Sequence, residues 1–308
     1  MKRFAGRLGL FVALNAAIGI LVLAAVDARY AFEQWQTDSL LLSTPRDTHF
    51  DLVILGTSHA RLFTRIKHNY DFLSDALDMQ VFNLAIPFGG GILLEKMYLR
   101  NFFERGNRAD ILLYFLDPYV FFSPLPNKYH KFVYYEPLRM SFLLEMIRNG
   151  MPFERVFTYI RSKFTYRWIT QEPVLIAYES ATLADWGIAL EPKRMRARAE
   201  SLYPDGLSQG YFQYYSPMLG EVLEMARAHQ CRMILAFPPT LLGHEKGAPQ
   251  VLELIEGYRK QYDFEFCDFT AAIDDVDLYY DYDHLNSPGL EAFVTRFLEP
   301  VLTERKGS

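Results

Sequence analysis

Residues 52–58 read Leu-Val-Ile-Leu-Gly-Thr-Ser, a short apolar run that ends at a glycine and two small hydroxyl residues. A run of this length without polar alternation is typical of a strand buried on both faces of a parallel sheet. Four similar runs follow along the chain, at 81–86, 111–116, 233–237 and 264–269. Helical patterns lie between them, which predicts an α/β fold with a parallel five-stranded sheet in a flavodoxin-like, three-layer α/β/α arrangement.

The spacing between the third and fourth runs indicates an insertion. About 110 residues separate them, whereas a crossover connection between parallel strands needs roughly a dozen. We therefore expect a helical insertion, or cap, at about 119–205, rich in Tyr, Phe, Trp and Arg, and a helix into the fourth strand that begins near Gly210. Ser287 is expected to cap a last helix with Pro288 at its first position.

The N-terminus carries an apolar run at 8–26 that is interrupted only by Asn15. At about 1.5 Å per residue this run reaches roughly 28 Å, near the thickness of a bilayer core. Lys2, Arg3 and Arg7 precede it, and such positive residues stay in the cytoplasm. We therefore expect a single-pass anchor in a bacterial inner membrane, with the C-terminal body in the periplasm. A cleaved signal peptide is the alternative, although its apolar core is usually only about 7–15 residues long.

These patterns divide the chain into three parts. Residues 1–28 are expected to form a cytoplasmic stub and the transmembrane anchor, 29–49 a stalk, and 50–308 the folded domain with its inserted cap.

The composition excludes several classes of partner. The formal net charge is −5, and an acidic body repels phosphate backbones, so we expect no nucleic-acid partner. No Gly-x-Gly-x-x-Gly or Walker pattern is present, so no cofactor is expected. His244-Glu245 lacks the second histidine of the His-Glu-x-x-His zinc motif, and no metal site is predicted.

Two polar segments carry the candidate chemistry. Ser58 opens the helix after the first strand, where free N–H groups and the helix dipole favour negative charge. Asp281 and His284 lie in the loop before the last helix, and an acid three residues before a histidine can hold one ring nitrogen while the other faces a nucleophile. Both segments belong at the same edge of the sheet, which predicts Ser58 as nucleophile, His284 as base and Asp281 as its partner. The alternatives are that Thr57 or Ser58 only caps the helix and that His284 is a surface histidine among solvated acids.

Three further residues are candidates for the oxyanion or substrate site: Gly89, Asn83 and His59. Gly89 opens a run of three glycines after the second strand, where a flexible backbone can turn an N–H toward an oxyanion. Asn83 ends that strand with an amide, and His59 follows the proposed nucleophile. A plain strand-to-helix turn, capping and packing explain these residues equally well.

The order of these blocks resembles the SGNH, or GDSL, hydrolase superfamily. The family's first block, Gly-Asp-Ser, appears as Gly-Thr-Ser at 56–58, and its last block, Asp-x-x-His, appears at 281–284. Its second block, an Asn followed by a Gly, is similar to Asn83 and Gly89, with one residue more than the commonest spacing. Its third block, Gly-x-Asn-Asp, is absent, since Leu-Asp-Pro stands at 116–118. The resemblance covers roughly residues 50–118 and 205–304 and implies the fold of that family and its Ser-His-Asp triad.

The single span, Ser58-His59 and the Asp-His-Leu-Asn ending at 283–286 are most similar to one subset of that superfamily, the membrane-tethered proteins that act beside membrane-bound O-acyltransferases. This resemblance implies transfer of an acyl group, expected to be acetyl, to or from a cell-envelope or exopolysaccharide glycan through an acyl-serine. A membrane-bound O-acyltransferase is the implied partner. One alternative is a periplasmic esterase or deacetylase with the same residues. Another is a non-catalytic assembly subunit of a glycan-modifying membrane complex, an alternative that the missing third block leaves open.

Overall fold

The structure, a computed structural model, describes residues 2–32, 39–63, 69–86, 90–129, 131–163, 182–185 and 191–303. The chain forms two compact units. The anchor unit joins Met1–Thr44 with Lys131–Val174, and the sheet unit joins Pro45–His130 with Leu175–Ser308.

Five parallel strands form the sheet, in the order β2-β1-β3-β4-β5. Their bounds are His49–Gly56 (β1), Val81–Asn83 (β2), Arg108–Phe115 (β3), Arg232–Phe237 (β4) and Glu265–Asp268 (β5). This is the strand order of flavodoxin-like doubly wound sheets. The predicted α/β fold with five parallel strands is confirmed.

The two edge strands are shorter than predicted. β2 ends at Asn83 because the side-chain carbonyl of this residue accepts a hydrogen bond from the Ala85 N–H at 2.7 Å, a local turn that competes with sheet pairing. β5 lies at the opposite edge and is only partly buried. An apolar run on an edge strand thus continues beyond the residues that pair.

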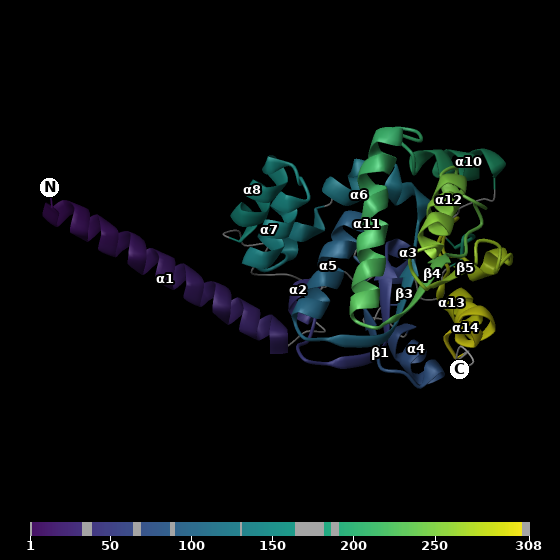
Figure 1. Cartoon of the computed structure of the whole chain (residues 1–308), viewed down its shortest axis with the longest axis horizontal. Coiled ribbons are helices and arrows are strands. Elements are labelled where there is room, and N and C mark those ends of the chain that lie inside the picture. Colours follow the sequence, from purple (N-terminus) through teal and green to yellow (C-terminus); the bar gives the residue numbers. More distant parts are fainter. Residues whose placement is uncertain are drawn as a thin grey trace. The chain divides into compact units, whose positions relative to one another are not determined.

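Helices cover both faces of the sheet (Figure 1). On one face lie α3 (Ser58–Arg61), α4 (Asn69–Leu77) and α13 (Ser287–Phe293), which share a buried cluster with alternate residues of β1 and β3. On the other lie α5 (Ile92–Glu104), α11 (Gln209–Ala228) and α12 (Ala248–Arg259). Residues of β3 alternate between these layers: Leu113 and Phe115 join the α13 cluster, and the Tyr114 hydroxyl donates to Glu95 of α5.

The helix termini differ from the prediction at one point. α11 begins at Gln209, next to the predicted Gly210. The cap of α13, however, is Asn286 and not Ser287, because the Asn286 side chain accepts the Gly289 N–H at 2.9 Å. A π-helical segment, Val294–Leu298, and α14 (Glu299–Thr303) continue from α13.

The described part of the predicted insertion is helical. The sheet unit contains a 3₁₀ turn at Pro118–Phe121, α6 (Pro124–Lys128) and α10 (Pro192–Ser201). The anchor unit contains a 3₁₀ turn at Phe132–Tyr135, α7 (Met140–Arg148) and α8 (Phe153–Ser162).

The N-terminal helix α1 spans Lys2–Phe32. Its segment Arg3–Val22 is long and apolar enough to cross a membrane, with a mean hydropathy of 1.9, and it is the one such segment among the described residues. A short buried helix, α2 (Leu40–Ser43), follows in the anchor unit.

Gly56 allows β1 to turn into α3. Its φ is +143°, and a Cβ at this position would lie 2.6 Å from the backbone oxygen of Phe115 and 2.9 Å from the Cβ of Ala60. Only glycine avoids both the unfavourable φ and the contact with the neighbouring strand.

We predict that Gly56→Ala lowers the free energy of unfolding by about 2–4 kcal/mol, measured by chemical denaturation of the full chain in detergent. Gly257→Ala is the matched control, because Gly257 lies in α12 with open space where its Cβ would stand. The control should raise the free energy of unfolding by up to about 1 kcal/mol through better helix propensity. Equal effects of the two substitutions would contradict this account.

Candidate active site

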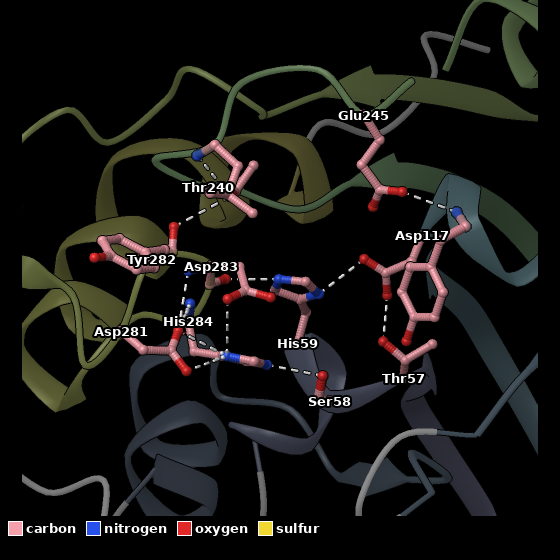
Figure 2. A network of polar contacts seen from close by, with 12 residues as sticks. Thr57, Ser58, His59, Asp117, Thr240, Glu245, Asp281, Tyr282, Asp283 and His284 are labelled. Carbon is pink, nitrogen blue, oxygen red and sulfur yellow. Dashed lines mark hydrogen bonds and ion pairs between the residues drawn. The ribbon is translucent and has the colours of Figure 1, made fainter. Parts of the chain in front are cut away.

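Ser58 and His284 lie at the same edge of the sheet, although one comes near the beginning and the other near the end of the sheet unit's sequence. β1 ends at Gly56, and Ser58 is the first residue of α3. His284 lies in a tight loop just before α13. A 2.8 Å hydrogen bond from the Tyr280 N–H to the His284 carbonyl oxygen closes this loop. This loop turns the His284 ring toward α3 (Figure 2).

The side chains of Ser58, His284 and Asp281 form one hydrogen-bonded line (Figure 2). The Nε2 atom of His284 lies 2.8 Å from the Ser58 Oγ, and its Nδ1 atom lies 2.9 Å from each Asp281 carboxylate oxygen. His284 is buried, whereas Ser58 is partly exposed. The structure thus brings together the three residues that the sequence predicts as nucleophile, base and orienting acid.

Asp281 is held as a carboxylate. Burial by itself raises the pKa of Asp281, but the hydrogen bond and charge of His284 and the backbone N–H groups of Asp283 and His284 lower it below the usual aspartate range. A permanent negative charge on this side keeps the His284 Nδ1 protonated, so that Nε2 is left to accept a proton from Ser58.

His59 also belongs to this site, where both of its ring nitrogens lie close to oxygen atoms of the chain. Its Nδ1 lies 2.8 Å from an Asp117 oxygen, and its Nε2 lies 2.6 Å from the carbonyl oxygen of Asp283. The ring stacks on that of His284 with centroids 4.8 Å apart. His59 therefore connects the loop after β3 to the loop that holds His284, and it also lines the pocket beside Ser58, as predicted.

The charge on His59 follows from its neighbours. Burial lowers the pKa of His59, but Asp117, through its charge and contact, and then Asp283 and Glu245 outweigh burial and raise the pKa to about 9. At neutral pH the ring is therefore a cation, in which both nitrogens carry protons that face oxygen acceptors.

Two more charged residues complete the network. Arg198 of α10 donates to both carboxylate oxygens of Asp283, at 3.2 and 2.7 Å. Glu245 follows β4 and accepts hydrogen bonds from the Tyr203 hydroxyl at 2.6 Å and the Tyr119 N–H at 2.9 Å. Burial and then the charge of Asp117 raise the pKa of Glu245 to about 8, so this carboxyl is largely protonated at neutral pH.

A pocket opens directly beside Ser58. It contains about 500 Å³ of empty space, including its open mouth, and Ser58, His59, Asp117, Arg198 and Glu245 contribute to its wall. The loop after β4 contributes both polar and apolar residues to the wall, among them Thr240 and Leu242. Such a pocket suits a small group that carries hydrogen-bonding atoms.

Asn83 does not fill its predicted place as an oxyanion donor. Its two amide hydrogens go to the carbonyl oxygens of Ala60 and Phe63, at 2.8 and 2.7 Å, and its own oxygen accepts the Ala85 N–H. The amide therefore braces the chain after α3 and has no hydrogen left for an oxyanion. Gly89, the other predicted donor, lies outside the residues that the structure describes.

Asp283, Arg198 and Glu245 were not predicted as site residues, and Asp117 was predicted only as a pocket-lining residue that capping or packing explains equally well. Asp117 directly follows β3 and Glu245 lies in the loop after β4, so their position at the carboxyl edge of the sheet was an available signal. Arg198 comes from the insertion, where no periodicity or motif indicates that it returns to the site.

His59, Asp283 and His284 are close enough together to share a cation. Each already has partners within the chain, however: His59 faces Asp117, Asp283 binds Arg198, and His284 lies between Ser58 and Asp281. A metal ion would have to displace these contacts, so the donor set fits a hydrogen-bonded network better than a metal centre. A second group, His49, Asp51 and Asp110, is largely exposed at the opposite end of the strands.

This arrangement can move a proton from a hydroxyl to an imidazole in a partly buried pocket. No protein-family model and no curated protein matches the chain. The geometry of the site therefore carries the functional argument.

The charge of His59 predicts a pH-dependent stability. Because the pKa is raised on folding from 6.5 to about 9, the charged ring contributes up to about 3 kcal/mol below pH 6.5, and this contribution is lost as the pH rises toward 9. The raised pKa of Glu245 acts in the same direction. We expect His59→Gln to lower the melting temperature clearly at pH 6 and progressively less toward pH 9.

His244→Gln serves as the control, since His244 is exposed and pairs with the partly exposed Asp268. This variant should follow the wild-type curve throughout. A constant offset between His59→Gln and the wild type across the pH range would show that His59 contributes by packing and not by charge.

Proposed function

We propose that this chain is a membrane-anchored acyltransferase of the SGNH type. It would move an acyl group, acetyl in the simplest case, to or from a cell-envelope glycan through an ester on Ser58. The observation that carries the proposal is the 2.8 Å contact between the Ser58 Oγ and the His284 Nε2, with Asp281 on the other ring nitrogen. A serine hydroxyl is a weak nucleophile, and this contact supplies the base that it needs.

The proposed reaction has two symmetrical halves. As the Ser58 oxygen attacks the carbonyl carbon of the donor ester, its proton passes to the His284 Nε2. The tetrahedral intermediate then expels the donor alcohol, which takes the proton from His284, and an acyl-Ser58 ester remains. In the second half His284 removes a proton from a glycan hydroxyl, which attacks the ester, and the proton returns to Ser58. Asp281 stabilises the imidazolium in both halves.

The oxyanion of the intermediate requires hydrogen-bond donors. The Ser58 N–H is one candidate, because the first N–H groups of a helix have no acceptor within it. Gly89 remains the proposed second donor. Each donor of this kind typically contributes about 3–4 kcal/mol to the transition state.

The pocket beside Ser58 supports a polar acceptor. Glu245 presents a largely protonated carboxyl, and Arg198 and His59 bring positive charge to the wall. Hydroxyl-rich sugars match such a mixture of donors and acceptors better than a long acyl chain does. An acetyl group fits within this pocket.

The N-terminal helix supports a tethered enzyme. Lys2, Arg3 and Arg7 precede the apolar segment, so we propose that the N-terminus is cytoplasmic and the sheet unit periplasmic. Hydrolysis alone needs no tether, whereas transfer from a membrane-embedded donor gains effective concentration from one. A membrane-bound O-acyltransferase is the proposed partner that supplies the acyl group.

Substitution of the proposed nucleophile tests the proposal. Ser58→Ala should lower the turnover of an activated aryl acetate by about 10³-fold or more, while the melting temperature of the full chain changes little. Asp281→Asn should cause a comparable loss, because it removes the charge that fixes the ring. Ser141→Ala, at an exposed position on α7, is the matched control and should keep full turnover.

The same assay, repeated with an oligosaccharide acceptor and read by mass spectrometry, separates transfer from hydrolysis. Acylated sugar that depends on Ser58 supports the transferase. If the acyl groups are transferred only to water, the protein is an esterase and not a transferase. Unchanged turnover in Ser58→Ala would refute an enzymatic role for Ser58.

A further inference from the structure

The two helices α7 and α8 of the anchor unit carry apolar side chains on their outer faces. Met140, Leu144 and Ile147 on α7 are 64 %, 44 % and 56 % exposed, and Phe153 and Phe157 on α8 are 82 % and 52 % exposed. We call these five residues the outer apolar surface. The rings of Phe153 and Phe157 stack with centroids 6.3 Å apart, so they form one continuous apolar patch on α8.

The opposite faces of both helices are already buried. Phe142 and Met146 of α7 and Val156 and Tyr159 of α8 are buried, and the Phe142 and Tyr159 rings pack with centroids 5.9 Å apart. The outer residues repeat at intervals of three and four, which places them together on the far side of each helix. A helix with apolar residues on both faces packs against its own protein on the inner face and is expected to contact lipid or another protein on the outer face.

The anchor unit joins these helices to the segment that follows α1. The buried Glu136 carboxylate accepts hydrogen bonds from the N–H groups of Leu40 and Leu41, at 3.0 and 3.1 Å, and from the Ser39 hydroxyl. This contact fixes α2 to the segment that leads into α7. Only six residues separate Phe32, the end of α1, from Ser39, and they reach at most about 25 Å when fully extended.

The charge of this segment fits the surface of a membrane. Between residues 131 and 163 there are six Lys and Arg residues against three Glu, whereas the whole chain carries a net charge of −5. Two of the acids, Glu136 and Glu145, are buried, whereas one acid, Glu154, and three cations, Lys131, Arg148 and Arg161, are exposed. An apolar face flanked by exposed cations is the pattern of helices that lie at the interface of anionic lipids.

We propose that the outer apolar surface lies in the boundary between lipid headgroups and acyl chains. The membrane would then hold the anchor unit at two places, through the span of α1 and through the α7–α8 pair. The inference rests on the insertion of α1 in the membrane, which belongs to the proposed function, and is independent of the chemistry at Ser58.

Spin labelling of the full chain tests this surface. The chain, with Cys231 and Cys267 replaced by serine, is reconstituted in vesicles of phosphatidylcholine and phosphatidylglycerol with a nitroxide on Phe157→Cys. Collision with oxygen, which concentrates in lipid, is compared with collision with a water-soluble nickel chelate. Leu14→Cys on α1 is the lipid reference, and Glu253→Cys, exposed on α12, is the aqueous reference.

We expect the Phe157 label to have an oxygen accessibility between those of the Glu253 and Leu14 labels, with several-fold less nickel accessibility than the Glu253 label. Nickel accessibility equal to that of Glu253 would overturn the proposal. Protection from both reagents would also overturn it, because it would show that a protein, either a partner or a second copy of this chain, covers the surface. Nickel access at Leu14 would refute the anchor itself, and that result is distinct from the other two.

Discussion

All five strands of the sheet point in the same direction, and this constraint gathers the polar groups of the site. Parallel pairing places Gly56 opposite Phe115, so the residues after β1 and β3 must emerge side by side. Ser58 and Asp117 meet the loops after β4 at that edge, and the final helix begins there too. His284 can therefore contact Ser58 although 226 residues separate them. Without this shared direction the same side chains would lie at opposite ends of the molecule.

The charges at this edge stabilise one another. Burying an unpaired charge is costly, and the cost falls only when partners and hydrogen bonds replace water. His59 has Asp117 on one nitrogen and the Asp283 carbonyl on the other, while the Asp283 carboxylate is held by Arg198. The position of His284 thus depends on residues that need not touch a substrate. Hydrogen bonds and ion pairs thus link four elements around the Ser58–His284 contact: the loops after β1 and β3, the loop before α13 and the helix α10.

Local sequence patterns predicted the features that depend on residues close together in the chain, namely the strands and the turn that holds Asp281 and His284. Apolar runs gave the strands, and the three-residue spacing of Asp281 and His284 placed them in one turn, because the intervening loop closes on itself. Asn83 was misassigned because its amide turns back onto neighbouring carbonyls, a choice that residue type alone cannot reveal. The return of Arg198 to the site and the contact of Glu136 with Ser39, 97 residues away, are set by long-range packing, for which the chain carries no periodic signal.

The proposed chemistry requires that Ser58 is a nucleophile activated by His284. Reaction of the full chain with a fluorophosphonate, which phosphorylates activated serines, tests this most directly. Peptide mapping by mass spectrometry should find one adduct, on Ser58, that is lost in His284→Ala while the chain stays folded, because the hydroxyl without its base is unreactive. An unmodified Ser58, or labelling that persists at the same rate in His284→Ala, would contradict the account.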